Sequence, residues 1–185
     1  MSKAVFSLEP ALELELEISE TRFGLLPEDL FRLAVRQNTQ RAFLFVSKVL
    51  GKHLPVEPAA LLAAGKLLAL AWLDQKDEQG WAGILKGSTA SPFFEVWDRL
   101  EHSRYSLGME DRALFLGFAE TATGLARAVA DCFDGEMAYI STTRVDRAGA
   151  SPLTFDEAHS HARTHRLYLD PHDPFMAACQ QVVLV

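Results

Sequence analysis

Residues 11–18 alternate apolar and acidic side chains without a break (Ala-Leu-Glu-Leu-Glu-Leu-Glu-Ile). This period of two predicts a half-buried strand with its glutamates in solvent, as is typical of a sheet edge. Pro27, followed by two acidic residues, predicts a helix over 27–37. A short apolar run at 43–46 predicts a buried strand, and Pro58 predicts the start of a largely apolar helix over 58–73.

The pattern becomes regular in the last third of the chain. In order, it predicts a core strand (113–119), a tight loop (120–124), a helix (125–133), a second strand (137–142), a polar histidine-rich segment (144–172), a short helix (174–179) and a buried strand (182–185). This alternation favours a right-handed parallel βαβ arrangement. We therefore predict an α/β fold with a partial, Rossmann-like parallel sheet flanked by helices.

The length of 185 residues suits one domain, or at most two. We divide the chain into an N-terminal segment, residues 1–112, and a core, residues 113–185.

Composition narrows the class of protein. Hydrophobic residues make up 49% and charged residues 23% of the chain, which is typical of a globular domain. The net charge of -7 argues against a general nucleic-acid or membrane-surface binder, because such proteins carry excess Lys and Arg. Cys132 and Cys179 suit buried free thiols rather than a disulfide framework. With no signal-like N-terminus and no apolar stretch long enough to span a bilayer, we expect a cytoplasmic protein.

The most informative local motif is the loop between the first core strand and the helix after it. Glu120, Thr121, Ala122, Thr123 and Gly124 occupy this turn. Hydroxyls, backbone N–H groups and the positive end of a helix suit a phosphate or pyrophosphate, and a glycine lets the backbone approach the ligand closely. The alternative is that Thr123 only caps the helix, which is common for threonine.

Two further groups of basic residues follow predicted strands. Lys48, Lys52 and His53 cluster after the strand at 43–46, although the Walker pattern of a phosphate loop is absent there. Arg144 ends the second core strand, where a guanidinium could bind a phosphate with two hydrogen bonds. The alternative for the lysines is an ordinary solvated surface, and for Arg144 an ordinary arginine at a strand end.

The polar segment near residue 160 holds Glu157, His159, Ser160, His161 and His165. The three histidines and a carboxylate could bind zinc, but their spacing matches no common zinc motif. A polar active-site loop is the favoured interpretation, because functional groups often lie on loops over a rigid scaffold.

Four ordered stretches of the chain resemble one family. They are Arg41–Val56 (Arg-Ala-Phe-Leu-Phe-Val-Ser-Lys-Val-Leu-Gly-Lys-His-Leu-Pro-Val), Leu116–Asp131 (Leu-Gly-Phe-Ala-Glu-Thr-Ala-Thr-Gly-Leu-Ala-Arg-Ala-Val-Ala-Asp), Tyr139–Arg144 (Tyr-Ile-Ser-Thr-Thr-Arg) and Phe155–Ala162 (Phe-Asp-Glu-Ala-His-Ser-His-Ala). The family comprises the orotate-phosphoribosyltransferase-like proteins of bacterial stress and tellurite-resistance gene clusters.

The resemblance implies a type I phosphoribosyltransferase fold, with an N-terminal α/β segment in the position of the family's hood. Such enzymes transfer phosphoribosyl from phosphoribosyl pyrophosphate (PRPP) to a base-like acceptor, and Mg²⁺ neutralises the departing pyrophosphate. By resemblance, the loop 120–124 and Arg144 hold pyrophosphate, and residues 145–166 form a mobile loop that closes over the site. Lys48, Lys52 and His53 match the family's motif without an established role.

The resemblance also implies an apolar strand followed by an acidic pair and Thr-Thr-Gly, which grip the ribose phosphate. The sequence stops at Val185, before that motif, so we expect a fragment that is inactive or weakly active alone. Three hypotheses stay open: a phosphoribosyltransferase domain acting in stress-related nucleoside-like metabolism, a non-catalytic sensor of nucleotides or phosphates, and a metal-dependent hydrolase using His159, His161 and His165. A homodimer is a further expectation.

Overall fold

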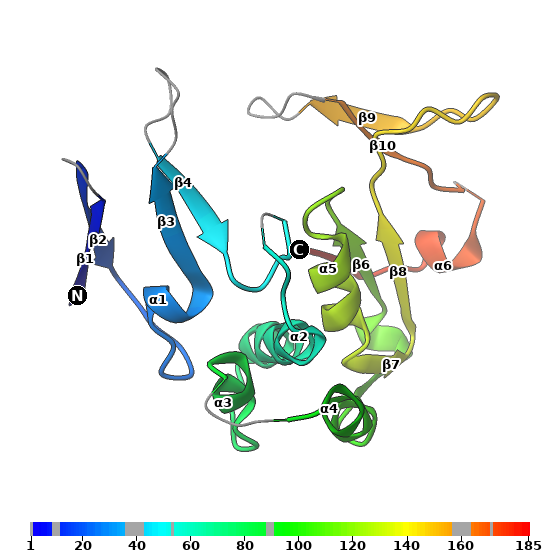
Figure 1. The fold of residues 1–185 in the computed structure, drawn as a ribbon. Coiled ribbons are helices and arrows are strands. Elements are labelled where there is room, and N and C mark those ends of the chain that lie inside the picture. The colour runs from blue at the N-terminus through cyan, green and yellow to red at the C-terminus, as the bar shows by residue number, and fades with distance from the viewer. Residues whose placement is uncertain are drawn as a thin grey trace. The chain divides into compact units, whose positions relative to one another are not determined.

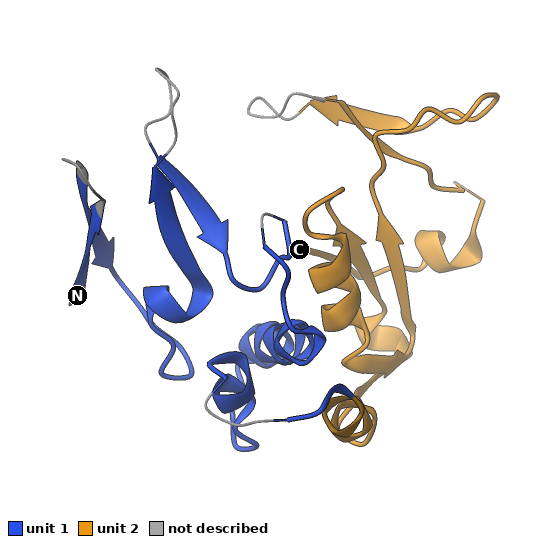
Figure 2. Ribbon diagram, viewed as in Figure 1, with its two compact units in different colours: residues 1–93 blue, residues 94–185 orange. Residues whose placement is uncertain are grey.

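The computed structural model describes residues 2–8, 12–35, 43–52, 54–87, 91–156, 164–170 and 172–185. The chain forms two compact units, residues 1–93 and 94–185 (Figure 2). The second unit therefore begins earlier than the core expected from residue 113.

The first unit begins with two paired strands. Strand β1 (Ser2–Leu8) pairs antiparallel with β2 (Leu12–Ile18), which lies where the apolar and acidic alternation predicts a strand (Figure 1). The β2 glutamates are exposed while its apolar side chains are partly buried, since successive side chains of a strand point to opposite faces.

A single helical turn and a strand replace the helix predicted over 27–37. Helix α1 (Pro27–Leu30) ends at once, and β3 (Phe31–Val35) pairs antiparallel with β4 (Phe43–Ser47). The start signal is real, because the Asp29 carboxylate accepts a hydrogen bond of 2.8 Å from the Leu26 N–H. The residues after it are aromatic and aliphatic and favour a strand once a partner strand is present.

Aromatic side chains connect the two strand pairs of this unit. The Phe31 ring lies 5.7 Å from that of Phe6 on β1 and 5.0 Å from that of Phe45 on β4. Such tilted and edge-to-face pairs stabilise packing beyond the buried area alone. The Phe31 ring thus connects β3 to both β1 and β4.

Helices complete the first unit. Helix α2 (Pro58–Trp72) is largely buried, including the side chain of Lys66, and packs against α3 (Trp81–Leu85). Both oxygens of the Asp77 carboxylate accept hydrogen bonds from the first amides of α3, at 2.9 and 2.8 Å. Across the described ranges, no helix is both long and apolar enough to cross a membrane.

A three-stranded parallel sheet forms the centre of the second unit (Figure 1). Strand β6 (Ala113–Gly117) lies between β8 (Met137–Ser141) and β11 (Gln181–Leu184), and α5 (Thr123–Ala130) packs against β6 and β8. Every residue of β6 is buried, as expected for the central strand of a parallel sheet. The predicted mixed α/β architecture with a parallel sheet is confirmed.

The other elements of this unit are short: α4 (Phe93–Glu101), β5 (Tyr105–Leu107), the 3-10 turn η1 (Met109–Asp111), β7 (Phe133–Gly135), β9 (Leu153–Asp156), β10 (Thr164–Leu167) and α6 (Pro174–Ala177). Strand β5 pairs parallel with β7, and β9 pairs antiparallel with β10. The helix predicted over 125–133 thus starts two residues earlier and ends before Phe133, which belongs to β7.

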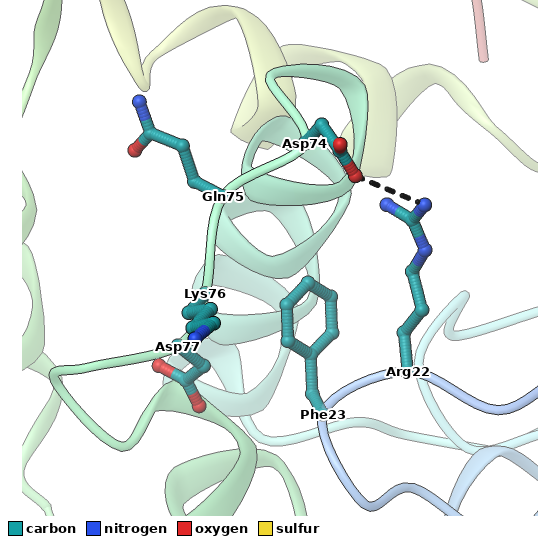
Figure 3. Close-up of a pocket in the computed structure, with 6 residues that line it drawn as sticks. All are labelled: Arg22, Phe23, Asp74, Gln75, Lys76 and Asp77. Atoms are coloured by element: carbon teal, nitrogen blue, oxygen red, sulfur yellow. Dashed lines mark hydrogen bonds and ion pairs between the residues drawn. The ribbon is translucent and has the colours of Figure 1, made fainter.

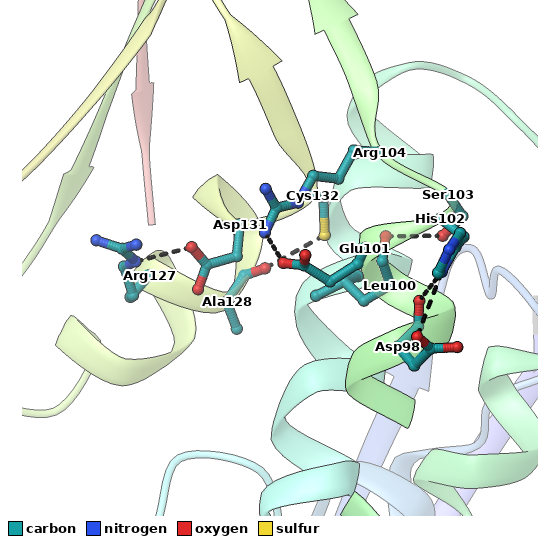
Figure 4. Close-up of polar contacts among 10 residues, drawn as sticks. All are labelled: Asp98, Leu100, Glu101, His102, Ser103, Arg104, Arg127, Ala128, Asp131 and Cys132. Atoms are coloured by element: carbon teal, nitrogen blue, oxygen red, sulfur yellow. Dashed lines mark hydrogen bonds and ion pairs between the residues drawn. The ribbon is translucent and has the colours of Figure 1, made fainter. Parts of the chain in front are cut away.

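Polar contacts hold the ends of α4 and α5 (Figure 4). After α5, the Cys132 thiol donates to the Ala128 carbonyl at 3.2 Å, and Arg127 pairs with Asp131 at 2.9 Å. Cys132 is fully buried, in agreement with the predicted free thiol. These contacts hold the two residues that connect the end of α5 to the start of β7.

Candidate functional site

The loop that joins β6 to α5 carries the predicted anion-binding residues. Ala122 is the N-cap of α5, and within the described residues no side chain caps this helix. Thr123 is the first helical residue, and its hydroxyl donates to the Glu120 carbonyl at 2.9 Å. The alternative in which Thr123 is the N-cap is therefore wrong. The first turn of α5 keeps backbone N–H groups that the helix itself cannot satisfy.

A glycine below this loop lets the helix approach the sheet closely. A Cβ atom at Gly117, the last residue of β6, would lie only 2.7 Å from the Ala126 Cβ of α5. The Tyr139 hydroxyl on β8 donates to the Thr123 carbonyl at 2.9 Å. The N-terminal turn of α5 is thus held by close packing on β6 and by a hydrogen bond from β8.

Arg144 lies beside the same loop. Its Nη2 donates to the Ala119 carbonyl at 3.3 Å, and its own carbonyl accepts from Arg166 Nη1 at 3.1 Å. Arg144 and the loop come together because parallel strands β6 and β8 end at the same edge of the sheet. The guanidinium brings a positive charge next to the positive end of α5.

Sequence reasoning missed one residue of this site, Thr142. Its side chain is only 2% exposed, and its Oγ1 accepts a hydrogen bond of 2.8 Å from the Ala119 N–H. The same Oγ1 lies 3.0 Å from Nδ1 of His165 on β10. The Ser-Thr-Thr stretch at the end of the second core strand is the signal that could have found it, but the sequence alone directs attention to the arginine after it.

The histidine-rich segment is described only in part. Glu157, His159, Ser160 and His161 lie outside the described residues. His165 is a buried residue of β10, and its ring stacks on the Phe155 ring with centroids 5.0 Å apart. Within the described part of the chain, no three His, Cys, Asp or Glu side chains gather as metal ligands.

The predicted basic cluster belongs to the first unit. Lys48 follows β4, and its ammonium group donates to the Glu28 carbonyl of α1. Lys52 is exposed, and His53 lies outside the described residues. Strand β4 pairs antiparallel with β3, so these lysines do not follow a strand of a parallel sheet, at whose carboxyl edge α/β proteins bind ligands.

Each unit also contains a cavity. A groove of about 570 Å³ in the first unit includes Phe23 and an Arg22–Asp74 ion pair of 3.2 Å (Figure 3). A smaller cavity of about 280 Å³ in the second unit lies along the end of β8 and includes Arg147 and Tyr168. The guanidinium of Arg147 lies 5.0 Å from the centre of the Tyr168 ring.

A phosphoribosyl transferase family model matches residues 30–185. The chain belongs to this phosphoribosyl transferase family. A search of curated proteins and a search of solved structures each found no match. The matched region includes β3, β4 and the whole second unit. Family membership implies that the chain binds a phosphoribosyl-containing substrate.

Proposed function

We propose that this phosphoribosyl transferase acts on PRPP, with the β6–α5 loop (residues 118–124) and Arg144 binding its diphosphate group. We call this segment the diphosphate loop. The observation that carries the proposal is the α5 N-terminus without a side-chain cap, directly after the loop, with the Arg144 guanidinium on the Ala119 carbonyl. Helix N-termini of this kind bind phosphate groups through backbone amides and the helix dipole.

Electrostatic stabilisation of the leaving group is the main chemical task in the proposed reaction. A ring nitrogen of the acceptor forms a bond to the anomeric carbon of the ribose. The bond from that carbon to the diphosphate oxygen breaks, and the electron pair leaves with the diphosphate. Negative charge therefore grows on the departing oxygens, where fixed amides and a guanidinium stabilise the transition state more than the ground state.

Mg²⁺ fits this proposal as a companion of the substrate. Magnesium commonly keeps several waters and binds through substrate phosphates and one or two carboxylates, so a complete protein cage is not required. Glu120 supplies an exposed carboxylate at the diphosphate loop and is the residue we propose to face the ion. The ion would neutralise charge on the diphosphate as it departs.

The acceptor belongs to the proposal only as a class, a base-like heterocycle with a nucleophilic nitrogen. We further propose that the first unit serves as the hood that selects this acceptor, and that Lys48 and Lys52 add positive charge for an anionic ligand. A role in stress-related nucleoside-like metabolism follows from the resemblance and is part of the same proposal.

Isothermal titration calorimetry with PRPP and with pyrophosphate, each with Mg²⁺, tests the binding step. We expect Arg144→Gln to weaken pyrophosphate binding about tenfold, because a charge-assisted hydrogen bond is worth about 1.5–3 kcal/mol. Arg32→Gln removes the same charge from an exposed position on β3 in the other unit and should leave affinity within about twofold, since the field of an exposed side chain is screened by salt. A wild-type protein that binds neither ligand would refute the proposal.

Turnover separates an enzyme from a sensor. Turnover of PRPP is measured as the release of pyrophosphate in the presence of a panel of purine, pyrimidine and pyridine bases. Release that depends on one base supports a transferase. Tight PRPP binding without release for any base would instead favour the non-catalytic sensor.

A further inference from the structure

We propose that Thr142 and His165 are positioning residues that couple the β9–β10 pair to the diphosphate loop. The inference rests on the proposed function, because it concerns how that loop is held in its binding conformation. Neither side chain is assigned a contact with the ligand. They act through Ala119, the residue directly before Glu120.

Both polar groups of the Ala119 backbone are held by side chains that follow β8. Its N–H donates to Thr142 Oγ1 at 2.8 Å, and its carbonyl accepts from Arg144 Nη2 at 3.3 Å. A residue held on both sides cannot rotate without breaking one of these bonds. The position of Ala119 in turn sets where Glu120 and the first turn of α5 begin.

The Thr142 hydroxyl links this backbone to a more distant strand. A threonine oxygen can accept and donate at once, since it has two lone pairs and one proton. While it accepts from Ala119, its proton can be donated to His165 Nδ1, 3.0 Å away. This assignment places the imidazole proton on Nε2. Because Thr142 and His165 are only 2% and 3% exposed, water cannot easily replace either partner.

Aromatic packing and a backbone bridge hold β10 in the register that this contact needs. The His165 ring is stacked nearly parallel to that of Phe155 on β9, at an angle of 2°, and both rings meet the Phe118 ring edge-on. Phe118 is the first residue of the diphosphate loop. Thr143 and Arg166 also exchange two backbone hydrogen bonds of 2.8 Å, next to Thr142 and His165 in the chain.

The β9–β10 pair therefore contacts the beginning of the loop in two ways, by rings at Phe118 and by a hydrogen-bond relay at Ala119. A shift of β10 that breaks the relay leaves the Thr142 hydroxyl without its acceptor and loosens the Ala119 amide. The consequence is that substitutions on β10 should weaken diphosphate binding without touching the ligand.

Amide hydrogen exchange and calorimetry test the relay together. Exchange of the Ala119 N–H is measured by NMR in the ligand-free protein, and the Kd for pyrophosphate with Mg²⁺ is measured on the same samples. The relay variants are Thr142→Val, which keeps the shape and removes the hydroxyl, and His165→Phe, which keeps the stacked ring and removes Nδ1. Thr142→Ser restores the hydroxyl, and Thr154→Val on exposed β9 is the matched control.

We expect Thr142→Val to raise Ala119 exchange about tenfold and the Kd about fivefold, as for loss of one buried hydrogen bond. His165→Phe should also raise both the Ala119 exchange rate and the Kd. It provides the test of the relay if Thr142→Val does not fold. Thr142→Ser should return both values to within about twofold of the wild type. The imidazole ¹⁵N shifts of His165 should report the proton on Nε2. The Thr142 contact favours this tautomer, because Nδ1 accepts the hydroxyl proton, whereas ring stacking favours neither tautomer.

Each other result is decisive. Ala119 exchange no faster in either relay variant than in the Thr154→Val control overturns the coupling. Faster exchange with an unchanged Kd overturns the positioning role. If the wild type binds no pyrophosphate, the proposed function fails, and the exchange rates of His165→Phe still decide whether β10 is coupled to the loop.

Discussion

Gly117→Ala tests whether close packing below the diphosphate loop sets the position of α5. The added Cβ would lie 2.7 Å from the Ala126 Cβ and 3.4 Å from both the Thr123 Cα and the Tyr139 hydroxyl. Carbon atoms pack best about 3.5–4.0 Å apart, so the overlap with Ala126 is about 1 Å. The neighbouring atom is on a helix and the new one on a central strand. Neither can rotate away, so helix and sheet must separate.

Overpacking of this kind costs about 1–3 kcal/mol. For a chain of this size, each 1 kcal/mol lowers the melting temperature by about 2–4 °C, so a cost of about 2 kcal/mol corresponds to about 4–8 °C. The separation also moves the first turn of α5 away from Arg144. We therefore expect weaker binding of pyrophosphate in addition to the lower melting temperature.

Thermal unfolding followed by circular dichroism measures the first effect, and calorimetry with pyrophosphate measures the second. Gly108→Ala is the matched control, because this glycine has an extended backbone and a Cβ added there would meet no described atom within 4 Å. This control reports the effect of Gly→Ala on the conformational entropy of the unfolded chain alone, which stabilises the protein by about 0.4–1 kcal/mol. Equal melting temperatures for the two variants would refute the packing argument.

Two further predictions concern stability. Asp77→Ala removes both acceptors for the first amides of α3 and should destabilise the protein by about 1 kcal/mol, whereas Glu78→Ala, at the neighbouring position, should change little; equal urea midpoints would contradict this role. Glu136→Gln should weaken the contact with Arg112 before β6, a 2.7 Å hydrogen bond, and lower the free energy of unfolding by less than about 1 kcal/mol. Glu110→Gln is the control, and the difference in stability between the two variants should shrink in 1 M salt. A difference that does not depend on salt would exclude an ionic origin.

The hydrophobic pattern predicts strands well in two cases: where alternate side chains are buried, and where all of them are. Residues 12–18 alternate, and 113–117 are apolar throughout, and both form strands. The helix over 27–37 could not be rejected locally, because Pro27 and the acids after it do start a helical turn. What ends that turn is pairing of residues 31–35 with 43–47, a contact between segments that no local signal connects.

The candidate site was predictable to the same extent. Parallel strands end at one edge of a sheet, so the loop after β6 and Arg144 after β8 could be placed together from the order of elements. Thr142 could not, because its importance comes from His165, which lies 23 residues later and packs beside it only in the fold. A polar histidine-rich sequence suggested a loop, yet His165 belongs to β10, which pairs with β9, and its ring packs against Phe155 and Phe118.

The acidic character of the protein does not conflict with an anionic substrate. The net charge of -7 belongs to the whole chain, whereas at physiological ionic strength a single charge acts over only about 8 Å. At the diphosphate loop, the α5 N-terminus and Arg144 attract an anion, while the exposed Glu120 carboxylate repels it. Under the proposed function this repulsion has a use, because the same carboxylate attracts a diphosphate that carries Mg²⁺. In that proposal the site would favour the metal complex of the substrate over the bare anion, and the metal complex is also the form with the better leaving group.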